Sequence, residues 1–234
     1  AVLCGADAVY LGLRGFNARA GAENFDENTL PQTVGWCHAR GVRVYVTLNT
    51  LVTDRELPQW LHSLDAVAAA GVDGVLVQDL GLAKIIRQRY PTLPLHASTQ
   101  FSGHNADAAR FLAAHGFTRM VAARELSRED LTALCKASPI EIETFAHGAL
   151  CMCYSGMCEM SAVIGGRSGN RGACAQPCRL RYGWHGKADA NPLSLKDANL
   201  AAYAGEMAEM GVACLKLEGR MKRPEYVAAV TGIY

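Results

Sequence analysis

The chain has 234 residues, of which 50% are hydrophobic, and a formal net charge of +1. This composition supports one sizeable core, so we expect a single barrel-sized domain over 1–234. The small net charge excludes a protein that binds nucleic acid through overall basicity, although a local basic patch stays possible. Arg, Asp or Gly interrupts every apolar run before it reaches the length of a membrane span.

No signal or transit peptide is visible in the chain. We therefore expect a cytoplasmic protein that does not associate with membranes. The chain begins with Ala1 and not with Met. We expect it to be a fragment in which an N-terminal strand of the fold is missing.

Short β-rich runs alternate with helical patterns along the chain. Most runs are apolar on both faces, as in parallel strands that are covered by helices. The candidate strands are 6–12, 43–49, 74–79, 94–100, 119–125, 140–147, 192–197 and 213–218. This alternation predicts an α/β fold, and eight candidates favour a (β/α)8 TIM-barrel-like architecture over an open doubly wound sheet. Since an N-terminal strand is expected to be missing, one candidate must lie outside the barrel, and 192–197 is the one that follows an irregular segment.

Polar residues mark several expected helix starts. One helix is predicted to begin after Asp79 and another near Asn105, while Ser127 with Asp130 approximates a capping box. Asp197 is expected to cap a helix that ends at Gly211.

In a barrel, the chemistry lies at the carboxyl ends of the strands. Polar side chains recur at nearly all of these ends in this sequence. They are Asn49, Gln78, Asp79, His96, Ser98, Thr99, Gln100, Arg124, Glu125, Glu143, His147, Lys196, Asp197, Lys216, Glu218 and Arg220. The recurrence predicts a polar pocket at this face, although Asp79 and Asp197 could serve only as helix caps.

The alternation breaks at 148–191, which contains no convincing strand or helix. A structureless stretch of this length in a compact domain is usually functional. Because it follows the candidate strand 140–147, it should lie over the active face. It contains five of the nine cysteines, namely Cys151, Cys153, Cys158, Cys174 and Cys178.

Thiols this close in sequence indicate either a metal site or disulfides. A reducing compartment argues against disulfides. Zinc sites usually contain paired C-x2–4-C spacings, and here only Cys174 and Cys178 are spaced in that way. An iron–sulfur cluster accepts wider and less regular spacing. The spacing favours the cluster and keeps zinc open, while Cys153, two residues from Cys151, is expected to point away.

The same segment carries arginines but no Asp or Glu between Met160 and Ala188. The run G-G-R-S-G-N-R-G at 165–172 could present backbone N–H groups to an anion. We expect Arg167, Arg171 and Arg179 to contact the phosphate of RNA or the carboxylate of a small molecule. The alternatives are a solvated loop, or cations that only offset the charge of a thiolate-bound metal.

The run E-T-F-A-H-G-A-L-C-M-C-Y-S-G-M-C-E-M-S at 143–161 resembles the signature of the peptidase U32 family of collagenase-like proteins. Every specified position matches. Similar motifs recur along the chain, with G-A-D-A-V-Y-L-G at 5–12, H-A-S-T-Q at 96–100 and K-L-E-G-R-M-K at 216–222. The loop G-G-R-S-G-N-R-G-x-C-A-Q-P-C is similar to the form found in the branch of this family that acts on RNA.

The resemblance implies an iron–sulfur protein that hydroxylates a pyrimidine of RNA without dioxygen. The product would be 5-hydroxycytidine in 23S rRNA or 5-hydroxyuridine at the wobble position of tRNA, with prephenate as a possible co-substrate. The resemblance also implies the ligands of a 4Fe–4S cluster, which would be Cys151, Cys158, Cys174 and Cys178.

We expect six residues to line the catalytic pocket, namely His96, Gln100, Glu143, His147, Glu218 and Arg220. We expect Asn49, with the three arginines Arg167, Arg171 and Arg179, to bind substrate. The chain could also form a homo-oligomer or pair with another member of the family.

Two other functions stay open. The family name implies a peptidase, although no Ser or Cys has a His base at a recognisable spacing and no H-E-x-x-H is present. A non-enzymatic scaffold, in which the cysteines bind structural zinc, is the other alternative.

Overall fold

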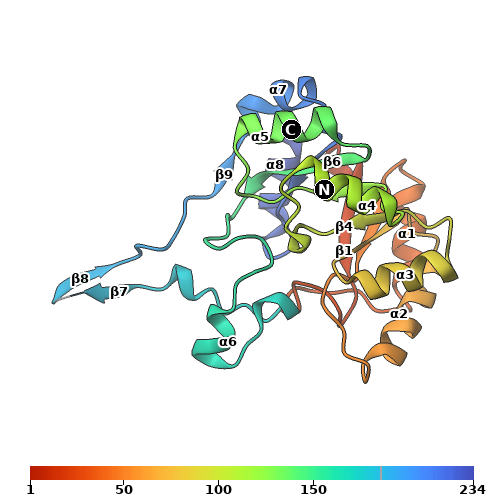
Figure 1. Ribbon diagram of the computed structural model, residues 1–234, viewed down its shortest axis with the longest axis horizontal. Coiled ribbons are helices and arrows are strands. Elements are labelled where there is room, and N and C mark those ends of the chain that lie inside the picture. Colours follow the sequence, from red (N-terminus) through yellow and green to blue (C-terminus); the bar gives the residue numbers. More distant parts are fainter. Residues whose placement is uncertain (185) are drawn as a thin grey trace.

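Seven parallel strands form one curled sheet in the computed structural model, which describes residues 1–184 and 186–234 (Figure 1). In spatial order they are β1 (Ala8–Gly12), β2 (Arg43–Thr47), β3 (Gly74–Val77), β4 (Leu95–Ala97), β5 (Arg119–Val121), β6 (Glu141–Gly148) and β10 (Cys214–Leu217). A short strand, β9 (Ala198–Asn199), runs antiparallel to β6. The α/β prediction is confirmed, and every strand of this parallel path lies inside one of the predicted runs or extends it by one residue.

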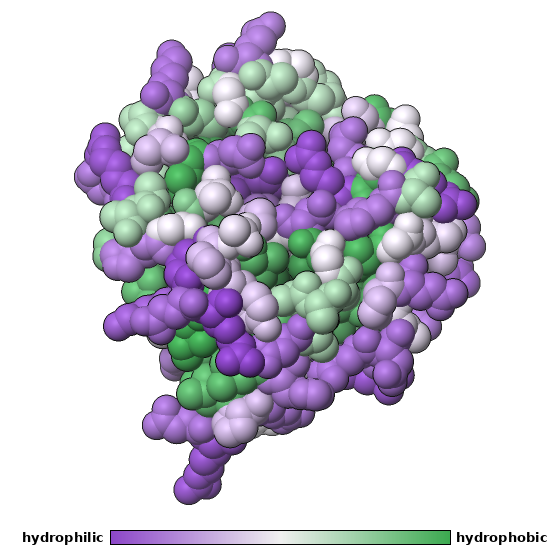
Figure 2. All heavy atoms as spheres, turned by 90° about the vertical axis from the view of Figure 1, so that its right-hand side faces the viewer, coloured by the Kyte–Doolittle hydropathy of each residue, from purple (hydrophilic) through white to green (hydrophobic). Residues whose placement is uncertain are grey.

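Helices follow most of these strands and cover the outer side of the sheet (Figure 1). They are α1 (Leu30–His38), α2 (Leu57–Ala69), α3 (Leu80–Arg89), α4 (Ala106–Ala114), α5 (Arg128–Ala137), α7 (Ala204–Glu209) and α8 (Pro224–Ile233). Three-residue 3-10 turns lie at η1 (Val2–Cys4), η2 (Thr99–Phe101) and η5 (Ala201–Tyr203). No helix in the described part of the chain is long and apolar enough to cross a membrane. Polar side chains cover most of the face in Figure 2, and hydrophobic ones show between them.

The alternation of side chains along the strands separates two apolar layers. In β2, Val44 and Val46 face the helices and join a buried cluster that contains Trp60 and Leu64 of α2. Tyr45, between those two valines, belongs instead to a smaller cluster on the inner side of the sheet. The sheet therefore has an apolar outer face, and its inner face is free to carry polar chemistry.

A closed eight-stranded barrel is not formed by the described residues. The edge strands β1 and β10 do not pair with each other, and the eighth member of the sheet is the antiparallel β9. A cavity of about 880 Å³ lies at this open edge and is lined by β1, β10 and α8. The candidate strand 192–197, which was expected outside the barrel, does not form a strand.

The segment between β6 and β9 contains more regular structure than the sequence indicated. It forms α6 (Met160–Gly165), the turns η3 (Gly169–Arg171) and η4 (Pro177–Arg179), and a hairpin of β7 (Tyr182–Trp184) and β8 (Lys187–Ala190). Figure 1 shows the hairpin extending away from the sheet. The prediction of no helix or strand was wrong because these elements are at most six residues long, too short to produce a clear period.

The predicted helix caps are confirmed for three helices. Asp79 Oδ1 accepts hydrogen bonds from the N–H groups of Gly81 (2.9 Å) and Leu82 (3.2 Å), and the Asn105 and Ser127 side chains accept from the first turns of α4 and α5. Asp197 does not cap a helix. It forms an ion pair with Lys222 (3.7 Å), and β9 and η5 separate it from α7.

The role of Asp79 can be tested directly. Replacing Asp79 with Ala removes the acceptor for two backbone N–H groups of α3, so we expect the free energy of unfolding to fall by about 1 kcal/mol. Asp79→Asn keeps an acceptor and should retain most of this stability. Urea denaturation measures both variants, and Asp107→Ala, in an exposed ion pair at the start of α4, serves as the control. Equal stability of Asp79→Ala and the unmodified protein would refute the capping role.

Candidate functional site

Glu218, which follows β10, is the central carboxylate at the carboxyl ends of the strands. It pairs with Arg19 (3.1 Å) and Arg124 (3.6 Å), and the phenol of Tyr10 in β1 donates to it (3.4 Å). Burial alone would raise the pKa of Glu218, but Arg19 and Arg124 hold it below its usual value. The carboxylate therefore stays ionised, while burial and Glu218 raise the pKa of Tyr10 and keep its phenol protonated.

A third arginine joins this group through neutral partners. Arg220 donates to Thr47 (3.3 Å), Asn17 (3.0 Å) and Asn24 (2.6 Å). A Cβ on Gly12 would lie 2.5 Å from the Arg220 guanidinium, so the absence of a side chain in β1 allows Arg220 to reach this position. We call Arg19, Arg124 and Arg220, together with Glu218, the mouth cluster.

The mouth cluster has two more guanidinium groups than carboxylates. Arg124 is largely buried, burial lowers its pKa, and its Nε has no hydrogen-bond partner in the described residues. A buried donor without a partner costs free energy, and a buried surplus of positive charge costs more. An anion that entered this site would satisfy both.

Asn49 and Gln100 hold the loops around the mouth cluster. The Asn49 side chain accepts from the N–H of Ala18 (3.1 Å) and donates to Ser98 Oγ (2.9 Å). It therefore links the segments that follow β1, β2 and β4. Gln100 donates its backbone N–H to the same hydroxyl (3.3 Å). Both predicted residues therefore lie at the carboxyl ends of the strands, where their hydrogen bonds hold the backbone of the loops.

We call residues 149–197 the cysteine-rich segment, and its first part, before the hairpin, lies across these strand ends. The N–H and hydroxyl of Ser155 donate to the two carboxylate oxygens of Glu125, at 3.0 and 3.1 Å. Gly156 lies directly against the backbone of Gln100, and the Ala20 N–H donates to the carbonyl of Gly172 (3.2 Å). The segment therefore contacts the loops that follow β1, β4 and β5.

The five thiols of this segment are free and lie near one another. Burial, then Cys158 and Cys151, raise the pKa of Cys153, which also forms a hydrogen bond with Cys158. Burial likewise raises the pKa of Cys178, and Cys151 and Cys174 add to this effect. Cys153 thus lies near Cys158. That it points away from a bound metal stays a prediction.

The thiols also lie beside the mouth cluster. Cys151 is within electrostatic reach of Arg124, and Cys174 is within reach of Arg19. Sulfur donors select thiophilic metals such as iron in clusters or zinc. The chemistry of the donors therefore fits either metal, although no three His, Cys, Asp or Glu side chains in the described residues are arranged to hold a metal ion.

Two of the three arginines predicted to bind an anion are engaged within the protein. Arg171 pairs with Glu56 of the turn before α2, and this pairing holds the pKa of Glu56 at about 2. Arg179 donates to Ser194 Oγ (2.9 Å) and to the Leu150 carbonyl (2.8 Å). Arg167 is exposed. The sequence prediction missed Arg19 as a site residue, because Arg19 lies in a loop and its pairing with Glu218 spans most of the chain.

The side chains of Glu143, His147 and His96 form their contacts outside the mouth cluster. The backbone carbonyl of His147 nevertheless accepts from the N–H of Glu218 (2.9 Å). Glu143 is buried inside the sheet between Lys216 Nζ (2.6 Å) and Arg119 (3.2 Å). The His147 ring packs against the rings of Tyr226 in α8 and of Tyr234, the residue after this helix, with centroids 5.9 and 5.8 Å away.

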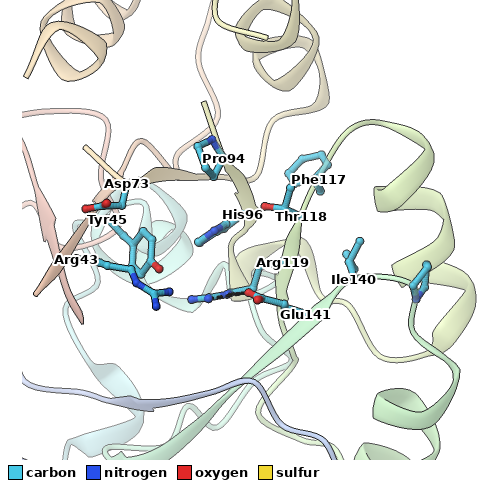
Figure 3. A pocket seen from close by; sticks show the side chains of 11 residues that line it. Arg43, Tyr45, Asp73, Pro94, His96, Phe117, Thr118, Arg119, Ile140 and Glu141 are labelled. Atoms are coloured by element: carbon cyan, nitrogen blue, oxygen red, sulfur yellow. Dashed lines mark hydrogen bonds and ion pairs between the residues drawn. The ribbon is translucent and has the colours of Figure 1, made fainter. Parts of the chain in front are cut away.

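His96 faces a pocket of about 550 Å³ at the opposite, amino-terminal ends of the strands (Figure 3). Figure 3 shows the His96, Tyr45 and Arg119 side chains pointing into this pocket, and the rings of His96 and Tyr45 have centroids 4.8 Å apart. Burial lowers the pKa of His96 to about 3, so the ring is neutral. The strand β4 has only three residues, which places His96 in its middle, while the sequence pattern placed it near the carboxyl end.

Comparison with known proteins identifies similar chains. The model of Peptidase family U32 matches residues 1–234. A protein of Escherichia coli (strain K12) named 23S rRNA 5-hydroxycytidine synthase is 40% identical over 240 residues, which cover 100% of this chain and 36% of that protein. The tRNA hydroxylation protein P1 of Bacillus subtilis (strain 168) is 35% identical, with coverages of 100% and 58%.

A third relative has a different kind of name. The collagenase of Porphyromonas gingivalis (strain ATCC BAA-308 / W83) is 34% identical, with coverages of 100% of this chain and 61% of that protein. The chain thus spans between 36% and 61% of the length of these three relatives. The solved structure of the U32 peptidase Mk0906 has a TM-score of 0.52 at 19% identity and covers 61% of this chain and 62% of that one, which supports the same fold.

His96 should make stability depend on pH. Its pKa is about 3 in the folded state against an ordinary value of 6.5, so only the unfolded chain takes up the proton between these values. The free energy of unfolding should therefore fall as the pH is lowered from 7.5 to 5. His96→Gln should reduce this dependence, as measured by urea denaturation at both pH values, with exposed His115→Gln as the control. An unchanged pH dependence in His96→Gln would contradict a neutral buried ring.

Proposed function

This chain belongs to peptidase family U32, and we propose that it forms part of an enzyme that hydroxylates a pyrimidine of RNA without dioxygen, using a 4Fe–4S cluster. Two relatives that cover the whole chain are named for rRNA and tRNA hydroxylation. The substrate would be a cytidine of 23S rRNA or the wobble uridine of tRNA. Such a substrate would place the activity in the cytoplasm.

One observation carries this proposal. The cysteine-rich segment brings Cys151 within electrostatic reach of Arg124, and Cys174 within reach of Arg19. Both arginines belong to the mouth cluster, which has a surplus of positive charge. A redox-active group and an anionic reactant could therefore meet at the carboxyl ends of the strands, where this type of fold carries its chemistry.

The cluster ligands in this proposal are Cys151, Cys158, Cys174 and Cys178. When bound, the cluster would supply electron transfer or a Lewis-acidic iron at this face. Cys153, which hydrogen-bonds to Cys158, would support the ligands without joining them. The Ser161 hydroxyl donates to the sulfur of Cys174 (3.8 Å), and such a hydrogen bond tunes a thiolate ligand.

The arginines of the mouth cluster would bind and orient the anionic reactant. Glu218 stays ionised and fixes Arg19 and Arg124, while the protonated phenol of Tyr10 donates to Glu218 and can hold a proton at the site. Prephenate is a dicarboxylate, and its two charges would match the two surplus cations. We therefore propose the mouth cluster as the binding site for this co-substrate, with the RNA phosphates as the alternative ligand.

The tests described below distinguish RNA hydroxylation from two other functions. A peptidase is suggested by the relative named collagenase, but no Ser hydroxyl or Cys thiol among the described residues forms a hydrogen bond with a histidine ring. A zinc-stabilised scaffold would use the same thiols without a reaction.

Metal analysis tests the cofactor. The full-length protein, purified without oxygen, should contain about four iron and four sulfide per chain if the cluster is 4Fe–4S. Changing Cys151, Cys158, Cys174 or Cys178 singly to Ser should abolish most of the iron, while Cys153→Ser should retain it. A colourless protein with one zinc per chain would refute the cluster.

Nucleoside analysis tests the reaction. Mass spectrometry of rRNA and tRNA from a strain without the gene should show the loss of one hydroxylated pyrimidine, and the intact gene should restore it. Arg124→Gln removes a charged contact at the mouth cluster and should slow the modification by about ten- to a hundredfold, because such contacts contribute about 1.5–3 kcal/mol. Arg110→Gln, in an exposed ion pair of α4, is the matched control. If every hydroxylated pyrimidine persists in the deletion strain, the RNA assignment fails.

A further inference from the structure

The turn between Cys151 and Cys158 presents one aromatic ring to solvent on an otherwise firmly held backbone. Tyr154 is 66% exposed, whereas the next residue, Ser155, is 4% exposed. Large exposed aromatic rings are uncommon on surfaces that bind nothing, and they are enriched where a protein meets a partner. The ring also stands one position from Cys153, beside the thiols of the proposed cluster.

The backbone next to Tyr154 is fixed by four contacts through Ser155. Its N–H and hydroxyl donate to Glu125, its hydroxyl accepts from the N–H of Arg124 (3.3 Å), and its carbonyl accepts from the hydroxyl of Ser102. These partners lie in the loops that follow β4 and β5. The position of Tyr154 is therefore set by the sheet, although the residue lies in an irregular turn.

The ring of Tyr154 has one aromatic neighbour among the described residues. It lies 6.0 Å from the ring of His104, at an angle of 65°. His104 is itself held, because its imidazole contacts Glu125 (3.0 Å) and the carbonyl of Ser102 (2.6 Å). Glu125 thus fixes the backbone beside the tyrosine, and it also lies within ion-pair distance of the imidazole that faces the tyrosine ring. The rest of the ring stays open to solvent.

We propose that Tyr154 is a stacking platform for an unpaired pyrimidine base of the RNA substrate. This inference rests on the proposed function and assigns a residue to base recognition within it. Every base has a flat face, and stacking on a protein aromatic contributes a large part of the binding of single-stranded RNA. A ring carried on a backbone that is already fixed loses less entropy when a base stacks on it than a ring on a flexible loop would. The exposed side chains of Met152 and Met157 extend the apolar surface on either side in the sequence.

Binding of short oligonucleotides to the full-length protein tests the platform. Labelled octamers of cytidylate and uridylate serve as probes, with fluorescence anisotropy as the readout. Tyr154→Ala should weaken binding by about five- to a hundredfold, since stacking of one base contributes about 1–3 kcal/mol. Tyr154→Phe keeps the stacking face and should stay within about twofold of the unmodified protein. Tyr203→Ala, which removes another exposed tyrosine far along the chain, is the matched control and should not change the affinity.

The salt dependence of binding separates stacking from charge. Tyr154 carries no charge, so Tyr154→Ala should lower the affinity without changing the slope of log K against log salt concentration. Iron content equal to that of the unmodified protein would show that the turn stays intact in the variant. Under those conditions, a loss confined to Tyr154→Ala supports the platform.

Three results would overturn it. They are equal affinities of Tyr154→Ala and the unmodified protein, an equal loss in Tyr203→Ala, and a loss of affinity in Tyr154→Phe as large as in Tyr154→Ala. Each of these leaves the proposed reaction standing, because the nucleoside analysis of the deletion strain tests that reaction independently.

Discussion

The candidate site depends on the ion pairs that the carboxylate of Glu218 forms with two arginines. Glu218 is a buried acid between two guanidinium groups from distant parts of the chain, Arg19 and Arg124. Breaking a buried pair by removal of one partner is costly because the remaining charge is left uncompensated. The loop after β1, the segment after β5 and the end of β10 are therefore tied together by charge. The surplus of cations that remains is the basis on which we propose an anion site at this face.

A second group of buried ion pairs, separate from the mouth cluster, lies on the inner side of the sheet. Glu143 is held there by Lys216 and Arg119, and the imidazole of His96 lies beside them toward the amino-terminal ends of the strands. This inner ion-pair group lies closer to the amino-terminal ends of the strands, whereas the mouth cluster lies at their carboxyl ends. Residues that look equivalent in the sequence therefore serve two tasks: Glu218 shapes the site, and Glu143 stabilises the sheet from within.

The strands and most helices could be predicted because their signals are local. Apolar runs such as the one over β3 and caps such as Asp79 are fixed by nearest neighbours in the chain. The assembly of the site could be predicted only in part. Arg19 pairs with a residue 199 positions away, and no local pattern reports such a contact. The sequence prediction placed His96 near the carboxyl end of its strand. Because β4 has only three residues, His96 lies in its middle and faces the pocket at the amino-terminal ends of the strands.

Gly156 and Gly172 determine how closely the cysteine-rich segment approaches the sheet. A Cβ on Gly156 would lie 2.3 Å from the Gln100 carbonyl oxygen, and a Cβ on Gly172 would lie 2.4 Å from that of Asn17. Both contacts are with backbone, which cannot move aside as a flexible side chain would. The absence of a side chain at these two glycines therefore sets how closely the cysteine-rich segment packs on the loops that follow β1 and β4. A larger residue at either position would move the thiols away from the buried arginines.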